Sequence, residues 1–281
     1  MKKTILFFAF VLSASLIFAQ DNISNVSQTG NDNITDVTQI GSSNKSLILQ
    51  DADLNSTTLS QEGTGNVNEA QSQGGSNLVN ISQVGDINNS VTLIGEGNNA
   101  ALTSQSGNGN TSRQELNAVD GNATSIQEGD NNTTIQLSNG AGNNTVFSQT
   151  VGSNNLSTQE QGNSEISNIY VDQLGDGNSS VIVQTGLSNN IGVRQTGDGN
   201  AVSTNQSGNN NFAGGENDVL VDQLGNGNSS LLSQNGDANA SALLQSGNGN
   251  EAINTQLSNT NNSIINQIGN TNKATVSQSN Q

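Results

Sequence analysis

Polar and apolar residues follow one another in a unit of eleven residues that recurs along most of the chain. Asparagine begins the unit at a constant step from Asn22 to Asn110, then from Asn178 to Asn211, and again from Asn217 to Asn272. Glutamine follows most of these asparagines by six residues, and glycine usually follows the glutamine by two. A fixed period of this kind indicates a repeat architecture, with the unit Asn-x5-Gln-x-Gly-x2.

Within one unit, the residues at offsets zero, two, four and six from the asparagine share one face of a strand, because successive side chains point to opposite sides. Offset two is often small or aliphatic, whereas the opposite face varies freely. Offset four is largely aliphatic, and its members in the second half of the chain are Ile182, Val193, Val221, Leu232, Leu243, Ile265 and Val276. We therefore predict that these aliphatic side chains lie inside the fold.

The remaining four positions of each unit predict a tight turn. Tripeptides such as Gly175-Asp176-Gly177 and Gly225-Asn226-Gly227 precede the next asparagine, and these residue types tolerate positive φ. The predicted fold is all-β: a two-sheet β-solenoid of 22-residue strand–turn–strand coils, each made of two 11-residue half-repeats. About 23 units give 11 to 12 coils, and at ~4.8 Å per coil the rod measures about 55 Å.

The inward asparagines and glutamines need partners, because a buried amide without a hydrogen bond costs on the order of 1–3 kcal/mol. Identical residues one coil away supply them, and each side-chain amide can bond to the next along the stack. We predict such polar ladders, with members Asn178, Gln184, Asn189, Gln195, Asn228, Gln234, Asn239, Gln245, Asn250, Gln256, Asn261 and Gln267.

The repeat region, residues 20–281, contains irregularities. It is irregular near 110–167, where the step from Asn110 to Asn122 is twelve and Ser167 replaces an asparagine. Near 212–217 the pattern predicts an inserted surface loop before a unit that begins at Asn217. Serine and isoleucine replace the ladder glutamine at Ser72 and Ile94, so we expect gaps in the ladder there.

Residues 1–19 have the pattern of a signal peptide: two lysines, a short apolar run, and Ala19 before a polar segment. This run is too short for a transmembrane helix, and no other segment is apolar enough to span a bilayer. Cleavage would leave 4 basic residues against 23 acids, a net charge of −19. That charge argues against nucleic acid and anionic lipid as partners. Since no second apolar segment exists, we also expect no membrane insertion after signal removal.

Residues typical of catalytic and metal sites are missing. The chain has no histidine and no cysteine, which removes the commonest nucleophile–base pairs and soft-metal ligands. Aspartate stands in few of the turns and the period is eleven, which disfavours calcium-binding nonapeptide repeats. We predict no catalytic residues, no metal site and no cofactor, and therefore no enzyme.

The double spacing Asn178, Gln184, Asn189, Gln195 resembles the curlin repeat of bacterial curli fibres. The resemblance covers nearly all of residues 22–278, although the first polar position is mostly asparagine here and usually serine in the family. It implies a secreted amyloid subunit of cell-surface fibres of a Gram-negative bacterium, serving biofilm matrix and adhesion. It also implies a nucleator subunit and outer-membrane export machinery as partners, although the family's separate N-terminal export segment is missing here.

Two readings of function remain open at this stage. In the first, the chain polymerises with itself into cross-β fibres, because uncapped ends of a solenoid present unpaired strand edges. In the alternative, the protein is a monomeric β-solenoid surface adhesin or a fibre nucleator. An ice-binding surface is disfavoured, because no outward column of a single residue type such as threonine occurs.

Overall fold

The computed structural model describes residues 21–140, 142–213 and 221–279, and these form 24 β-strands with no helix among them. Alternating strands belong to two sheets, here called sheet A and sheet B. Sheet A contains β1 (Ile23–Thr29), β3 (Lys45–Asp51), β5 (Val67–Gln73), β7 (Asn89–Ile94), β9 (Thr111–Asn117), β11 (Thr133–Gly140), β13 (Leu156–Glu165), β15 (Ser179–Leu187), β17 (Ala201–Ser207), β20 (Ser229–Asn235), β22 (Glu251–Leu257) and β24 (Lys273–Gln278). Sheet B contains β2 (Ile34–Ser42), β4 (Ser56–Thr64), β6 (Leu78–Val84), β8 (Ala100–Ser106), β10 (Asn122–Glu128), β12 (Thr145–Val151), β14 (Asn168–Leu174), β16 (Asn190–Thr196), β18 (Phe212–Ala213), β19 (Val221–Leu224), β21 (Ala240–Ser246) and β23 (Asn262–Ile268).

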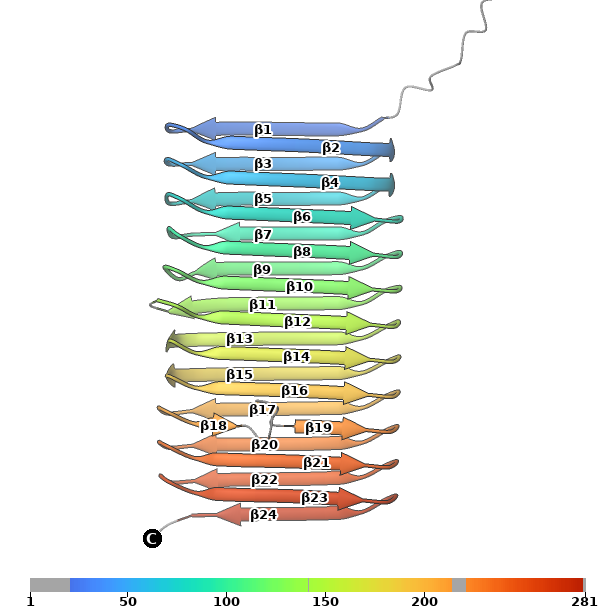
Figure 1. Ribbon diagram of the computed structural model, residues 1–281, viewed down its shortest axis with the longest axis vertical. Helices are drawn as coiled ribbons and strands as arrows, with labels where there is room; N and C mark the ends of the chain where they lie inside the picture. The colour runs from blue at the N-terminus through green and yellow to red at the C-terminus, as the bar shows by residue number, and fades with distance from the viewer. Residues whose placement is uncertain (1–20, 141, 214–220, 280–281) are drawn as a thin grey trace, which may run out of the picture.

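The chain winds down a rod in which successive strands, apart from β18 and β19, lie half a coil apart and on opposite sheets (Figure 1). Every pairing is parallel, and most join residues 22 apart, as Gln184 and Gln206 are joined between β15 and β17. Strands β18 and β19 lie in one layer, because both pair with β16 above and β21 below. The 24 strands therefore fill 23 repeat positions. The predicted two-sheet β-solenoid of 22-residue coils is confirmed.

The inner faces of the two sheets form the core. In β15, Ser180, Ile182 and Gln184 are buried, while the residues between them face outward to varying degrees. This alternation follows from the two-residue period of a strand. The buried apolar residues form two clusters, one between Ile48 and Ala123 and the other between Val146 and Ile265. Each coil thus packs against its neighbours along the rod.

The turns use positive φ at two positions, as their glycine content predicts. Gly175 has φ +118° and Gly177 has φ +66°. A side chain at the first position would collide with the next coil, because a Cβ built on Gly175 lies 2.2 Å from the carbonyl oxygen of Gly197. The second position is roomier and accepts other residues in the left-handed region, for example Ala238 at φ +57°. Glycine at the first position therefore lets successive turns stack closely.

The prediction that the repeat unit after Asn110 begins twelve residues later, at Asn122, is wrong. Gly121 takes the place of the asparagine, since its N–H donates to Oδ1 of Asn99 at 2.7 Å, and Asn122 faces outward. The spacing there stays eleven, because a strand's register depends on pairing with the neighbouring coil and not on residue type. Longer spacings occur later, where a full coil takes 23 residues instead of 22, from Asn132 to Asn155 and from Asn144 to Ser167.

The insertion interrupts a strand instead of preceding one. Phe212 and Ala213, expected in the inserted loop, form β18, and Asn211 begins this layer with its N–H bonded to Oδ1 of Asn189 at 2.9 Å. The layer resumes at Val221 in β19. Asn217, expected to begin a unit, lies outside the described residues. The signal peptide assigned to residues 1–19 also lies outside them and stays a prediction.

Candidate assembly surface

Glutamine amides form ladders along the rod, which are interrupted in sheet A where Ser72, Ile94, Leu116 and Ser138 take the glutamine position and in sheet B at Thr150. In each step, Nε2 of one glutamine donates to Oε1 of the glutamine one coil later, as Gln184 does to Gln206 at 3.1 Å. The sheet A ladder continues through Gln234 and Gln256 to Gln278, with spacings of 2.6 to 2.9 Å. The corresponding sheet B ladder runs through Gln173, Gln195, Gln223, Gln245 and Gln267, with spacings of 2.8 and 2.9 Å. All of these bonds point in the same direction along the rod.

The asparagines use a different connection from the amide-to-amide bond that the sequence suggested. Oδ1 of Asn178 accepts the backbone N–H of Asn200 at 3.0 Å, and Nδ2 of Asn178 donates to the carbonyl of Gly197 at 2.8 Å. A direct amide bond accompanies this in some coils, as between Asn200 and Asn178 at 3.1 Å. Asn178 therefore ties the beginning of its strand to the turn of the next coil, whereas Nδ2 of Asn99 donates to Glu96 in its own turn. The backbone N–H groups of Asn228, Asn239, Asn250 and Asn261 donate in the same way to an asparagine of the preceding coil. The N–H of Asn189 donates instead to Oγ of Ser167.

A third polar column was missed by the sequence reasoning. Gln114, Gln136 and Gln159 occupy offset four in sheet A, where aliphatic residues stand elsewhere, and bond to one another at 2.9 Å. Leu116 takes the usual glutamine position beside them and is buried. The column separates the two apolar clusters on sheet A. Its signal was available, since the three residues stand four places after Asn110, Asn132 and Asn155.

The predicted inner aliphatic residues lie at offset four on the inner faces of both sheets. Ile182, Val193, Val221, Leu232, Leu243 and Ile265 are buried, and Val276 in the last described strand is half-buried. Val276 is less covered because no described strand lies beyond β24. The burial therefore decreases at the end of the rod and not along its length.

Strand edges at the two ends of the rod are open. No described residue pairs with the outer edges of β1 and β2 at one end or of β23 and β24 at the other. All seven side chains of β1 are exposed, and those of β24 are exposed or half-buried. Unpaired edges of this kind are templates for pairing with another chain.

The hydrogen-bonding groups at the two ends are complementary. At the first end, Oε1 of Gln28 and of Gln39 accepts no hydrogen bond from any described residue, although both Nε2 atoms donate. At the other end, Oδ1 of Asn261 and of Asn272 accepts none within the described part of the chain, although each N–H donates. In the interior, these same atoms are bonded to the adjacent coil. The ladders therefore stop at the ends with the atoms needed to continue them.

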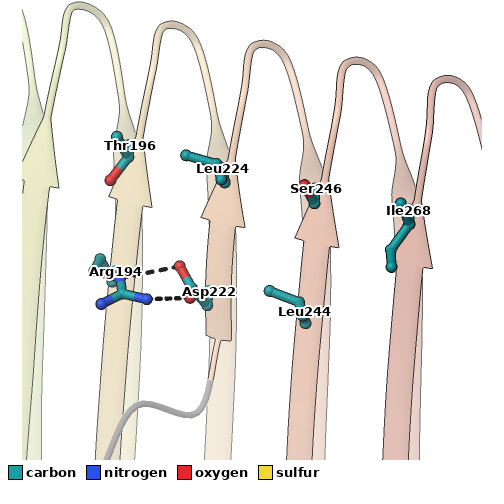
Figure 2. Close-up of a pocket in the computed structure, with 7 residues that line it drawn as sticks. All are labelled: Arg194, Thr196, Asp222, Leu224, Leu244, Ser246 and Ile268. Atoms are coloured by element: carbon teal, nitrogen blue, oxygen red, sulfur yellow. Dashed lines mark hydrogen bonds and ion pairs between the residues drawn. The ribbon is translucent and has the colours of Figure 1, made fainter. Parts of the chain in front are cut away.

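The outer face of sheet B carries a shallow groove beside the interrupted layer (Figure 2). Nε of Arg194 donates to Oδ1 of Asp222 at 3.1 Å, and this bond raises the pKa of Arg194. Burial raises the pKa of nearby Asp172. Apolar side chains complete the groove, which is lined by Arg194, Thr196, Asp222, Leu224, Leu244, Ser246 and Ile268.

The described ranges contain no group of three or more acidic, cysteine or histidine side chains placed to hold a metal ion. Nor does any helix with the length and apolarity to cross a membrane occur among them. The surfaces that stand out are therefore the open strand edges and the ladders behind them.

Comparison with known proteins agrees with this geometry. The family model described as the curlin associated repeat matches residues 30–63 and 167–197. These segments contain the strands β2 to β4, apart from the last residue of β4, and β14 to β16 with their ladder residues. A comparison with curated proteins finds no match. The two matched segments, and the 22-residue coils that continue between them, show that the chain carries repeats of the curlin associated type.

Proposed function

We propose that this protein is a secreted structural subunit that assembles with itself into extracellular curli-like amyloid fibres for biofilm matrix and adhesion. The observation that carries the proposal is the pair of open, complementary strand edges at the ends of a parallel solenoid. A second copy would extend both sheets and both glutamine ladders without a change of register. The ~4.8 Å strand spacing along the rod would then become the repeat of a cross-β fibre.

The two segments that match the curlin associated repeat support the same function, because repeats of this type occur in subunits of curli fibres. We expect export across the outer membrane of a Gram-negative bacterium after cleavage within the signal peptide, residues 1–19. We also expect a nucleator subunit and dedicated export machinery as partners. No enzymatic activity is part of this proposal.

Assembly of the purified chain from Gln20 onward tests the proposal. A dye that binds cross-β structure follows the time course, and electron microscopy and fibre diffraction examine the end point. Fibres with a meridional reflection near ~4.8 Å are the expected result. A folded chain that stays monomeric for days at high concentration would refute self-assembly and favour a surface adhesin.

A blocked growing edge provides a sharper version of this test. Glu251 N–H bonds to the carbonyl of Asn272, so by the alternation of a parallel ladder the N–H of Thr275 points to the open edge. Thr275→Pro removes that donor without removing a hydrogen bond inside the chain. The variant should fold but fail to elongate at this end. Thr275→Ala, which keeps the N–H, is the matched control and should grow normally.

A further inference from the structure

Both outermost strands of the described rod belong to the same sheet. β1 begins sheet A and β24 ends it, while the ends of sheet B, β2 and β23, each lie half a coil inside (Figure 1). This follows from the odd number of repeat positions, 23, that the strands fill. The arrangement decides how a second copy can be seated.

The ladders determine the polarity of such a contact. In the interior, each glutamine Nε2 donates toward the later coil, as Gln245 does to Gln267 at 2.8 Å. Each asparagine N–H donates toward the earlier coil, as that of Asn272 does to Asn250 at 3.0 Å. The end formed by β23 and β24 therefore needs a partner with free glutamine Oε1 and asparagine N–H groups. The end formed by β1 and β2 presents these groups, so the occupant is a second copy in head-to-tail orientation.

Two head-to-tail seatings are conceivable, and they differ in which strands meet. If β1 of the second copy lay on β24, sheet A would continue, but β2 would lie two layers from β23. One layer of sheet B, about 4.8 Å deep, would then be empty, and the edges facing it would lose their backbone partners. If β1 instead lies on β23, then β2 lies on β24 and every layer is filled.

The second seating also matches the residues that meet. Both strands of each new pair begin one place after their ladder asparagine, so equal offsets face each other. Val26 would lie beside Ile265, and Val37 beside Val276, on the inner face. Gln28 would extend the ladder that ends at Gln267 in β23, and Gln39 the ladder that ends at Gln278 in β24. These two strands form the bottom of the rod in Figure 1.

We infer that successive copies join with β1 on β23 and β2 on β24, so that each subunit is turned by half a revolution about the rod axis relative to the one before. Sheet A of one subunit then continues as sheet B of the next. The inference rests on the proposed self-assembly. It predicts that features of one outer face, such as the groove at Arg194, alternate between the two sides of the fibre. One subunit spans about 55 Å, and the pattern repeats every ~110 Å.

Pairs of single cysteine variants distinguish the two seatings, because the natural chain has no cysteine. Ser27, Thr38 and Ser277 are all exposed and stand at the same outward offset in β1, β2 and β24. In the inferred seating, Ser277 adjoins Thr38 of the next copy, whereas Ser27 of that copy lies on the opposite face. In the other seating, Ser277 adjoins Ser27 instead.

The measurement is pyrene excimer fluorescence in fibres grown from equal mixtures of two pyrene-labelled variants. Ser277→Cys mixed with Thr38→Cys should give strong excimer emission, several-fold above that of Ser277→Cys mixed with Ser27→Cys. The reverse ratio, or equal and weak emission in well-formed fibres, would overturn the inference and leave the proposed fibre function intact. Complete failure of the unlabelled chain to form fibres would overturn the proposed function as well.

A change in the number of repeats tests the half-turn directly. Gold attached at Thr58→Cys, an exposed position on sheet B, should alternate between the two sides of the fibre in electron micrographs. Deletion of one unit, residues 239–249, makes the number of positions even and should bring all gold to one side, with a period near 53 Å at ~4.8 Å per coil. Gold on one side in the unshortened chain, or unchanged alternation after the deletion, would overturn the half-turn.

Discussion

Two glycines in one turn should respond very differently to the same substitution. A Cβ on Gly175 would lie 2.2 Å from the carbonyl oxygen of Gly197, and the residue has φ +118°. A Cβ on Gly177 meets nothing within 4 Å, at φ +66°. Gly175→Ala must therefore displace the next turn, whereas Gly177→Ala needs only the left-handed conformation that Ala238 already adopts at φ +57°.

The magnitudes follow from these contacts. Gly177→Ala should cost about 1 kcal/mol, the ordinary penalty of a side chain in the left-handed region. Gly175→Ala adds strain of about 2 kcal/mol in a less favourable region. It also disturbs the hydrogen bonds from Asn178 Nδ2 to the Gly197 carbonyl, 2.8 Å, and from Gly197 N–H to Leu174, 2.9 Å. At ~1 kcal/mol each, these bring its total to about 4 kcal/mol.

Hydrogen exchange of the backbone amides around residues 174–200 measures this difference locally. At ~1.4 kcal/mol per tenfold change in the opening equilibrium, Gly175→Ala should accelerate exchange about a thousandfold and Gly177→Ala about fivefold. Exchange that differs by less than about threefold between the two variants would refute the argument that the next coil restricts Gly175. Exchange of the backbone amides far from the turn, in β4, is the control, because acceleration there as well would indicate global unfolding.

Three further results are expected. Ile265→Asp places a charge on the inner face of β23 and should slow fibre growth strongly, whereas the outward Ser277→Asp should change the growth rate little. Equal growth rates of the two variants would mean that offset four does not face inward. Gln206→Leu removes the acceptor of Gln184 and the donor to Gln234. Each of these two buried amides then lacks a partner, at a cost on the order of 1–3 kcal/mol, so the variant should lower the denaturation midpoint more than an outward change such as Thr58→Ala. Burial raises the pKa of Asp172, so the protonated carboxyl favours the folded state below its unfolded pKa, and this contribution to stability is lost as pH rises through the folded pKa. Asp172→Asn should therefore flatten the pH dependence of the denaturation midpoint between about pH 3 and about 6. An unchanged pH profile would contradict the assignment.

The eleven-residue period by itself determined much of this protein. It identified the strands, the turns and the inward offsets, because the two-residue period of a strand and the φ preference of glycine act over a few residues. Ile182 and Gln184 were placed on the inner face from their spacing to Asn178 alone. The glutamine ladder residues were also named from the sequence, since identical amides at a 22-residue spacing can satisfy one another only in a parallel stack.

The tertiary structure decided which residue in each unit meets which residue one coil away. Gly121 takes an asparagine's place while Asn122 faces outward, because the strand register is set by backbone pairing with coils 22 residues distant. For the same reason Phe212 and Ala213 remain in a strand before the interruption. The asparagine ladder likewise depends on the position of the next turn, which a single unit does not encode. Local periodicity therefore fixes the faces of strands, whereas the pairing between distant coils fixes the register.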